Sequence, residues 1–531
     1  MADAGGSVLD TKITRKPGRI SVAIFVCVLM GGVAYSGGSL LSDLAPIHST
    51  PSFEFVLLGL TLAIALGFEF VNGFHDTANA VATVIYTHSL EPNVAVVWSG
   101  LWNFIGVLTS SGAVAFGIVS LLPVELILNA GTHAGFAMIF ALLFSAILWN
   151  LGTWYFGLPN SSSHTLIGSI LGVGLMNQLM APQKTGTSGV DWTQAIGVGK
   201  SLLFSPLIGF LCSALLFLLM KRFVRNHALY CEPVGNEPPP FWIRSMLVLT
   251  CTGVSFAHGS NDGQKGMGLI MLILVGTVPA AYALNHAVSG AEVQTFLAVS
   301  EKTSRVLTAY ANPGATAPPR GRPVLEQLVS QSRMEPSTLP ALAAAVARIA
   351  TDVAPYGAFA RVPIELSGNI RNDMYLADEA LRVIDSKHLV PFKAEEAEAI
   401  QNYRRTLDRS TKFIPTWVKV AVALALGLGT MVGWKRIVIT VGEKIGKSHL
   451  TYAQGATSEM IAMATILAAD RFGLPVSTTH VLTSGVAGTM AANHSGLQWG
   501  TLRALGAAWL MTLPASIALS GGLFWIFRHL L

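Results

Sequence analysis

Charged residues are scarce in this sequence. Only 12% of its 531 residues are Asp, Glu, Lys or Arg, and 52% are hydrophobic, whereas ordinary soluble domains carry about 25% charged residues. This deficit excludes a soluble globular fold. Catalytic signatures are also lacking, because the sequence contains no G-x-S-x-G, no P-loop and no H-E-x-x-H motif. We therefore expect neither an enzyme nor transport driven by ATP hydrolysis on this chain.

Cysteine is also rare. The chain has four cysteines and no C-x-x-C pair, which predicts neither a disulfide framework nor a metal site. The net charge of +5 does not indicate nucleic-acid binding, because the basic residues form short clusters beside apolar runs. Such clusters are typical of the cytoplasmic loops of membrane proteins.

Long apolar runs are abundant. A bilayer core needs about 20 consecutive apolar residues, so the sequence predicts an all-α, multi-pass protein of the cell (inner or plasma) membrane, with the lipid bilayer as its surroundings. The first run follows a basic stretch, as in a signal peptide, but lacks an A-x-A site, and we expect it to be retained. The clearest runs are Ser21–Leu41, Val94–Leu122, Gly135–Gly157, Ile196–Met220, Trp417–Trp434 and Thr501–Phe527.

One region breaks this pattern. Residues 286–413 are rich in charge, Pro and Ala, and they predict a hydrophilic, partly helical insert. Within it, 339–349 and 373–385 have helical spacing of apolar residues, whereas 311–323 is typical of a linker. The expected organisation is an N-terminal extension with one membrane helix at 1–52, a first repeat at 53–225, a second repeat at 242–285 and 414–531, and the insert at 286–413.

An internal repeat underlies this division. The segment LPNSSSH at 158–164 returns as LPVSTTH at 474–480, and a Gly-rich apolar stretch follows each. Upstream, GFHDTAN contains Asp76 and GSNDGQK contains Asp262. Asp and Pro are 83 residues apart in the first copy and 213 in the second, and the insert accounts for nearly all of the difference. Transporters built from two such halves hold their substrate between the halves at mid-membrane. Similarity alone does not show whether the copies are inverted.

An ionisable cluster marks the first copy. Asp76 is flanked by Asn72, His75 and Asn79 within an apolar stretch. An unpaired carboxylate there would cost several kcal/mol, so we interpret the cluster as a substrate or ion site rather than an interhelical hydrogen-bond network. Nearby Gly and Asn residues would let the helix break and free backbone groups for ions. Glu69, seven residues earlier on the same helix face, is a candidate for ion coupling.

The matching cluster in the second copy consists of Asn261, Asp262, Gln264 and Lys265. We expect an apolar helix to begin after it, near Gly266. Lys265 is either the ion-pair partner of Asp262 or a source of positive charge for an anion, and the sequence does not decide between these roles.

The two Pro-led elements carry runs of hydroxyl side chains. A Pro at a first helical turn is followed by free N–H groups, and these with the hydroxyls suit a tetrahedral oxyanion. Ordinary helix capping is the alternative, but two copies, each before a short Gly-rich span, favour a paired re-entrant site. Counted with the histidine in each, the first run consists of Ser161, Ser162, Ser163, His164 and Thr165, and the second of Ser477, Thr478, Thr479 and His480.

Two further kinds of group are candidates for coupling. His164 and His480 could titrate during transport, although packing partners are the alternative. Glu459, beside an apolar stretch, could relay protons or bind a cation.

Five segments together resemble the Pit family of inorganic phosphate transporters, and its bacterial low-affinity branch in particular. The resemblance covers about residues 54–527. The segments are GFHDTANAVATVIYT, GLPNSSSHTLIGSILGVGL, FAHGSNDGQKGMGL, EKIGKSHLTYAQG and GLPVSTTHVLTSGVAGTM.

This resemblance implies an inverted-repeat carrier with discontinuous and re-entrant helices. Phosphate would lie among both hydroxyl runs and Asp76, Asn79 and Asp262. The implied function is import of inorganic phosphate by cation symport, with protons rather than sodium, and with phosphate carried as a neutral complex with a divalent metal. No cofactor and no fixed metal site are expected. His75 stands where other branches have Asn, which we take as a hypothesis about the coupling ion.

Several alternatives stay open at this point. The function could be sodium-coupled phosphate symport, a passive oxyanion channel, a sulfate or arsenate carrier, or a membrane receptor whose insert binds a partner. Assembly as a homodimer is left open.

Overall fold

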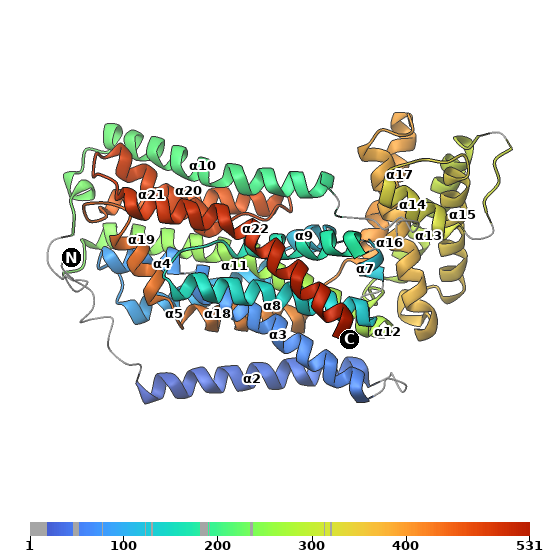
Figure 1. Ribbon diagram of the computed structural model, residues 1–531, viewed down its shortest axis with the longest axis horizontal. Coiled ribbons are helices and arrows are strands. Elements are labelled where there is room, and N and C mark those ends of the chain that lie inside the picture. Colours follow the sequence, from blue (N-terminus) through green and yellow to red (C-terminus); the bar gives the residue numbers. More distant parts are fainter. Residues whose placement is uncertain are drawn as a thin grey trace.

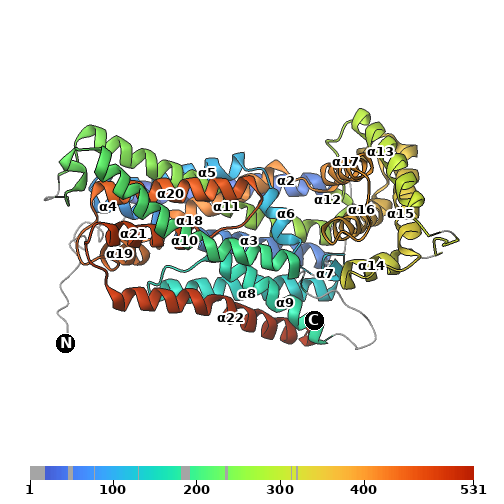
Figure 2. The ribbon, with the colours of Figure 1, turned by 90° about the horizontal axis from the view of Figure 1, so that it is seen from above.

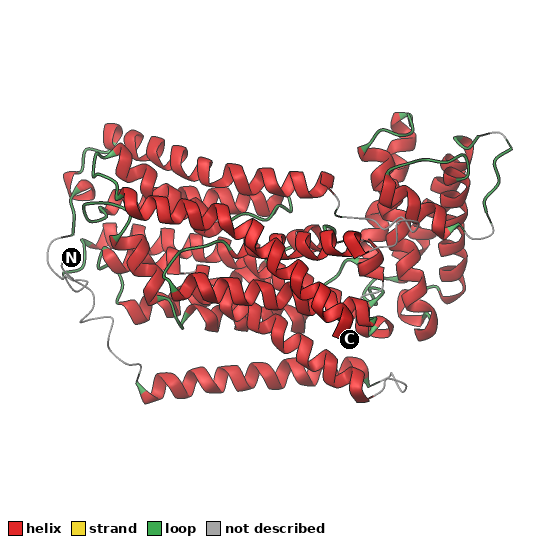
Figure 3. Ribbon diagram, viewed as in Figure 1, coloured by secondary structure: helices red, strands yellow, loops and turns green. Residues whose placement is uncertain are grey.

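The computed structural model is helical throughout the part of the chain it describes, which comprises residues 18–45, 52–76, 78–122, 124–128, 131–180, 190, 192–233, 237–312, 314–318 and 321–530. Within these ranges no strand forms, apart from an isolated antiparallel bridge between Gly446 and Leu497 (Figure 3). The predicted all-α fold is confirmed.

The membrane part consists of long helices whose axes lie roughly parallel or antiparallel to one another (Figures 1 and 2). Among the described residues, five helices are long and apolar enough to cross a membrane, or up to seven if each of two bent pairs is one span. The predicted run 94–122 is one of these pairs, since it bends by 77° between α5 and α6. The helices are α2 (Arg19–Leu44), α3 (Ser52–Asp76), α4 (Ala78–Tyr86), α5 (Pro92–Thr109), α6 (Ala113–Val119), α7 (Val124–Leu128), α8 (His133–Tyr155), α9 (Ser162–Met180), α10 (Trp192–Phe223), η1 (His227–Tyr230), α11 (Phe241–Thr277), α12 (Pro279–Tyr282), α18 (Thr416–Thr430), α19 (Lys435–Glu443), α20 (Tyr452–Arg471), α21 (Thr478–Ala492) and α22 (Trp499–Leu530).

The residues of the predicted insert form a bundle of helices beyond one end of the membrane part (Figure 1). The stretches 339–349 and 373–385, where helical spacing was predicted, lie within α15 and α16. Phe296 anchors the bundle, because its ring stacks on Tyr403 at 6.1 Å and meets Phe359 at 5.9 Å between ring centroids. The helices are α13 (Gly290–Ala309), α14 (Arg322–Gln331), α15 (Thr338–Val353), η2 (Ala354–Tyr356), η3 (Phe359–Arg361), α16 (Ile364–Ser386) and α17 (Ala394–Thr411).

The two sequence copies pack against each other reciprocally. Helix α3 of the first copy packs on α18 of the second, and α11 of the second packs on α5 of the first. A Cβ atom added at Gly73 would collide with the carbonyl oxygen of Leu426, and one at the equivalent Gly259 would collide with that of Asn103. Glycine therefore lets both pairs of backbones touch, and the sequence repeat is also a repeat of packing.

The helices that follow the hydroxyl runs show the same reciprocal packing between the two copies. Helix α9 packs on α22, and its equivalent α21 packs on α10. The equivalent His164 and His480 meet with ring centroids 4.6 Å apart, as residues beside a local two-fold axis do. Helix α10 leads away from the insert end toward α11, whereas α22 ends near the insert end (Figures 1 and 2). These opposite directions fit inverted copies, and inversion stays a prediction.

Each hydroxyl run follows a tight break between two helices. After α8 and α20 the chain turns at Gly157 and Gly473, whose φ of +66° is left-handed and favours glycine. Helices α9 and α21 begin three residues after their prolines, so the prolines precede the first turn and do not occupy it, contrary to our expectation. At 15 residues α21 is about 22 Å long, shorter than a bilayer core of about 30 Å.

A second expectation about helix ends is wrong. No helix begins near Gly266, because α11 runs unbroken for 37 residues through the whole Asn261–Lys265 cluster. Its glycines are held in helical conformation by close packing; Gly259 lies against α5, and Gly268 against the backbone of Ala115 in α6. The second cluster therefore sits in the middle of a helix.

Helix α2 lies at the edge of the membrane part, with most of its apolar side chains exposed. Asp43 in its last turn accepts hydrogen bonds from the Tyr282 hydroxyl at 2.7 Å and from Trp417 Nε1 at 3.1 Å. These contacts tie α2 to the two segments that lead into and out of the insert. Assembly as a homodimer, which would involve a second copy of the chain, stays a prediction.

Candidate functional site

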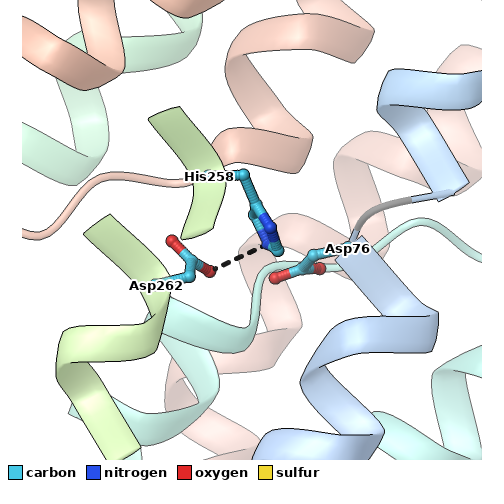
Figure 4. Close-up of side chains that lie close together, drawn as sticks. All are labelled: Asp76, His258 and Asp262. Atoms are coloured by element: carbon cyan, nitrogen blue, oxygen red, sulfur yellow. Dashed lines mark ion pairs between the residues drawn. The ribbon is translucent and has the colours of Figure 1, made fainter. Parts of the chain in front are cut away.

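Four helix segments bring polar side chains to one buried point: the end of α3, the middle of α11 and the first turns of α9 and α21. Asp76 faces His258 and Asp262 across this point (Figure 4). One ligand atom from each of the three lies within 4.8 Å of the others. Asp76 is 2% exposed and Asp262 is fully buried, so the point is shielded from solvent.

Asp76 collects hydroxyls from both copies. Its carboxylate accepts hydrogen bonds from Ser162 Oγ at 2.5 Å and from Thr479 Oγ1 at 2.9 Å. Its Oδ1 lies 3.0 Å from His75 Nδ1, and the other ring nitrogen of His75 lies 3.2 Å from Thr153 Oγ1 of α8. The predicted first cluster and both hydroxyl runs therefore meet at this carboxylate.

Asp262 is paired differently. Its Oδ2 lies 2.6 Å from Lys265 Nζ and 3.5 Å from His258 Nε2. Ser162 Oγ and Thr478 Oγ1 also approach the carboxylate, at 3.4 and 3.5 Å. Lys265 is fully buried.

Lys265 takes part in both roles that the sequence left open. It is the ion-pair partner of Asp262, and it also donates a hydrogen bond to Ser163 Oγ at 2.5 Å. Its ammonium therefore lies among the hydroxyls where an anion would bind.

The hydroxyl runs divide between capping and the centre. Ser161 Oγ accepts from the His164 N–H at 3.2 Å, and Ser477 Oγ accepts from the His480 N–H at 3.1 Å. The capping interpretation thus holds for the first hydroxyl of each run. Thr165 donates back to its own helix, to Ser161 O at 2.9 Å. The second and third hydroxyls of each run face the centre, where they contact the carboxylates or Lys265. Ser163 Oγ also donates to the Val476 carbonyl oxygen at 2.6 Å.

Asn261 and Gln264 hold the surrounding segments and do not touch the carboxylates of Asp76 and Asp262. Asn261 Nδ2 donates to Leu474 O at 3.2 Å, just before the second hydroxyl run. Gln264 Nε2 donates to Asp470 Oδ1 at 2.5 Å, and its Oε1 accepts from the Val114 N–H at 2.9 Å. Both residues fix the walls of the site.

The His164 and His480 rings meet beside the centre, tilted by 42° to each other. Their rings are 4.6 Å apart, and His480 also stacks on Trp509 with centroids 4.1 Å apart. This arrangement agrees with a packing role, and their titration during transport stays a prediction.

The other candidates lie at different places. Buried Glu69 packs against Gly266 of α11 and accepts from Asn72 Nδ2 at 3.3 Å. Buried Glu459 accepts from the hydroxyls of Thr83 and Thr250, at 2.5 Å from the latter, and forms a separate site. The side chain of Asn79 lies outside the described residues.

Three residues that complete the centre were not predicted from the sequence: His258, Thr153 and Asn103. His258 had a signal, since it precedes Asp262 by four residues and so shares its helix face. Its Nδ1 lies 2.8 Å from Asn103 Oδ1 of α5. Nothing local marks Thr153 or Asn103, because only tertiary packing brings α8 and α5 here.

The centre combines two chemistries. Two carboxylates and an imidazole are cation ligands, and such a set suits divalent metals. The hydroxyls and the Lys265 ammonium are hydrogen-bond donors that suit an oxyanion. An anion and a cation can therefore be held side by side.

A comparison with known families decides the family. The model described as "phosphate transporter family" matches residues 72–520, which include every segment of the centre. The chain belongs to the phosphate transporter family. Its predicted multi-pass location in the cell membrane and its non-enzymatic nature are thereby confirmed.

Curated relatives agree with this membership over nearly their full length. The low-affinity inorganic phosphate transporters PitA and PitB of Escherichia coli K12 are each 41% identical, with 89% and 90% of this chain and 96% and 97% of the relatives covered. A probable low-affinity inorganic phosphate transporter of Bacillus subtilis is 26% identical over 89% of this chain and 98% of its own. A solved structure titled "The sodium-dependent phosphate transporter" has a TM-score of 0.48 and 18% identity. The match covers 90% of this chain and 100% of the chain in that structure.

Proposed function

We propose that this chain imports inorganic phosphate by symport with a cation. The observation that carries the proposal is the meeting of two hydroxyl-bearing helix starts with two carboxylates at a buried point. Ser162, Thr478 and Thr479 can turn from the carboxylates to phosphate oxygens. The family membership and the names of the relatives support phosphate as the substrate.

The carboxylates make a cation necessary. Asp76 and Asp262 offer oxygens within 4.8 Å of each other. Lys265 balances only one of these two negative charges, so a phosphate between them would be repelled by the other. At 4 Å, two unit charges repel by about 4 kcal/mol at an effective dielectric constant of 20. Phosphate therefore binds well only when a cation enters with it, which is the physical basis of obligatory coupling.

We propose the proton as the coupling cation. Lys265 Nζ lies 2.6 Å from Asp262 and 2.5 Å from Ser163 Oγ, so an ammonium already takes the place of an alkali cation at the second-copy carboxylate. The first-copy carboxylate lies 3.0 Å from His75 Nδ1, so these two groups can share a proton. Both features favour protons over sodium.

We also propose that a divalent metal can travel with phosphate as a neutral complex. Asp76, His258 and Asp262 supply ligand atoms close enough to hold the metal of such a complex. The phosphate of the complex would face Lys265 and the hydroxyls, which offsets the repulsion between the ammonium and the metal. In this proposal the metal is cargo and not a resident cofactor.

A carrier fits the centre better than a passive oxyanion channel does. The carboxylates are 0–2% exposed, and Ser163 of the first run bonds to Val476 of the second at 2.6 Å. Such closure requires the two re-entrant starts to separate before substrate can leave, as alternating access does.

Phosphate uptake into proteoliposomes tests the proposal. We expect an inward proton gradient to accumulate phosphate above its external concentration, and a protonophore to abolish this. Accumulation that follows a sodium gradient instead would contradict proton coupling, and downhill flux alone would indicate a channel. Addition of Mg²⁺ should raise uptake if the complex is carried, while sulfate and arsenate competition defines selectivity.

A further inference from the structure

A second polar cavity lies between the insert and the membrane part. It has a volume of about 500 Å³ and is bounded by α6 and α11 on one side and α16 and α17 on the other. Gly268 and Met271 of α11 line it, about 1.7 and 2.5 helical turns beyond Asp262, so it is distinct from the centre. Its volume is within the range of about 300–1,000 Å³ for small-molecule sites.

Basic side chains predominate in this cavity. Among the described residues that line it, five are basic and three are acidic. The acids are already neutralised: Asp378 lies 2.9 Å from Arg404, Glu379 lies 2.7 Å from an Arg382 nitrogen, and Asp408 lies 2.5 Å from Lys412 Nζ. The lining therefore has an excess of positive charge. The five basic residues are Arg371, Arg382, Arg404, Arg409 and Lys412.

Arg371 is the residue whose charge is least compensated. Its guanidinium packs over the Tyr375 ring at 5.0 Å and, among the residues that the structure describes, donates only to the Asn372 amide oxygen at 3.3 Å. Its Nε is buried without a hydrogen-bond partner in the described part of the chain. Burial lowers the pKa of this guanidinium from its ordinary value, as expected of a desolvated cation without a counter-charge.

The cavity is open to solvent on the side of α17. Arg409 at this side is 73% exposed, Lys412 is 31% exposed and Arg404 is 19% exposed. Arg409 Nη1 lies 3.9 Å from Glu292 Oε1, which is beyond hydrogen-bond distance. An anion from solution would therefore find hydrogen-bond donors at Arg409 as well as at Arg371.

We propose that this cavity binds a phosphate-bearing small anion, held by Arg371 and Arg409, at a site separate from the transport centre. Arginine suits this ligand because its planar fork of donors matches two phosphate oxygens. The volume admits free phosphate or a phosphorylated small molecule such as a nucleotide. An anion bound here joins the insert to α11, the helix that carries Asp262 and Lys265.

Equilibrium dialysis of the purified full-length protein with radiolabelled inorganic phosphate tests the site. We expect wild type to bind two phosphates per chain if phosphate itself is the occupant, and Arg371→Gln to weaken one of them at least tenfold. Arg409→Gln, at a side chain that is 73% exposed, should weaken the same one about threefold. Arg305→Gln, on the exposed face of α13, is the matched control and should change neither.

Dialysis with radiolabelled ADP distinguishes the two sources. If a nucleotide is the natural occupant, wild type binds one ADP and Arg371→Gln binds it at least tenfold more weakly, while the single phosphate of the transport centre is unaffected. The proposal is overturned if phosphate and ADP binding are the same in wild type, Arg371→Gln and Arg409→Gln. Phosphate uptake by Arg371→Gln, measured in parallel, shows that the transport centre is intact.

Discussion

The two copies of the repeat bring equivalent aspartates to one point but neutralise them differently. Asp76 lies at the end of α3, beside His75 and two hydroxyls. Asp262 lies in the middle of α11 and forms an ion pair with Lys265. The packing is symmetric and the charge is not. The Asp262 carboxylate carries an internal ammonium counter-charge, whereas the Asp76 carboxylate is held by an imidazole and hydroxyls. In the proposed symport, Asp76 is therefore the carboxylate that meets the incoming cation.

Replacing the aspartates should have the largest effect and should separate the copies. Asp76→Asn and Asp262→Asn should each reduce phosphate uptake more than about a hundredfold, because both disrupt charge balance in a dehydrated site. Only Asp262→Asn leaves a buried ammonium without a counter-charge, which costs about 3–5 kcal/mol of stability. Initial uptake rates and thermal unfolding of the purified variants measure the two effects.

The double variant Asp262→Asn with Lys265→Gln sharpens this comparison. It should recover most of the lost stability and none of the transport, because it removes the unpaired charge and leaves the centre incomplete. If Asp76→Asn loses as much stability as Asp262→Asn, the charge asymmetry between the copies is wrong.

The hydroxyl runs should respond according to position rather than residue type. Ser162→Ala and Thr478→Ala should raise the KM for phosphate about ten- to a hundredfold, because each removes a hydrogen bond to a charged group. Ser161→Ala removes an N-cap and should lower stability by about 1 kcal/mol with little change in KM. Ser330→Ala in the insert is the control. Equal KM values for Ser161→Ala and Ser162→Ala would favour capping for the whole run.

Much of the fold and of the candidate site could be predicted from the sequence, because the signals for them are local. Apolar runs gave the membrane helices, and the repeated Leu-Pro-hydroxyl element gave two helix starts that do meet. Asp76 and Asp262 could be paired in advance because each stands beside Gly and amide residues in an apolar stretch, where a carboxylate is expensive without a function.

What could not be predicted depends on packing between distant segments. The glycines near Asp262 suggested a helix break, yet α11 is continuous, since those glycines serve close contacts with α5 and α6. Thr153 and Asn103 look like ordinary helix residues until α8 and α5 pack against the centre. The division of each hydroxyl run into a cap and ligands also needed the observed start of the helix.

Substitution of matched glycines tests the symmetric side of the comparison. Gly73→Ala and Gly259→Ala each place a Cβ against a backbone carbonyl, of Leu426 and Asn103 respectively. We expect each to lower stability by about 1–3 kcal/mol through overpacking, to a similar extent in the two copies. Gly67→Ala, which faces open space on α3, should be neutral or slightly stabilising. A large effect at only one of the two positions would show that the copies do not pack equivalently.

The smallest effect is expected in the insert, which only the second copy carries. Burial raises the pKa of Glu379 above its ordinary value, although Arg382 lies 2.7 Å away. A carboxyl with a raised pKa binds its proton more tightly when folded, so it lowers stability as pH rises from its ordinary pKa through the raised one. Glu379→Gln should therefore be more stable relative to wild type at pH 7.5 than at pH 4.5, by about 1 kcal/mol or less. Thermal unfolding at the two pH values measures this difference, and the exposed Glu398→Gln should show none. If Glu379→Gln is less stable than wild type at pH 7.5, the ion pair with Arg382 contributes more than burial costs. Glu379 would then resemble Asp262, whose buried charge is balanced by a fixed cation.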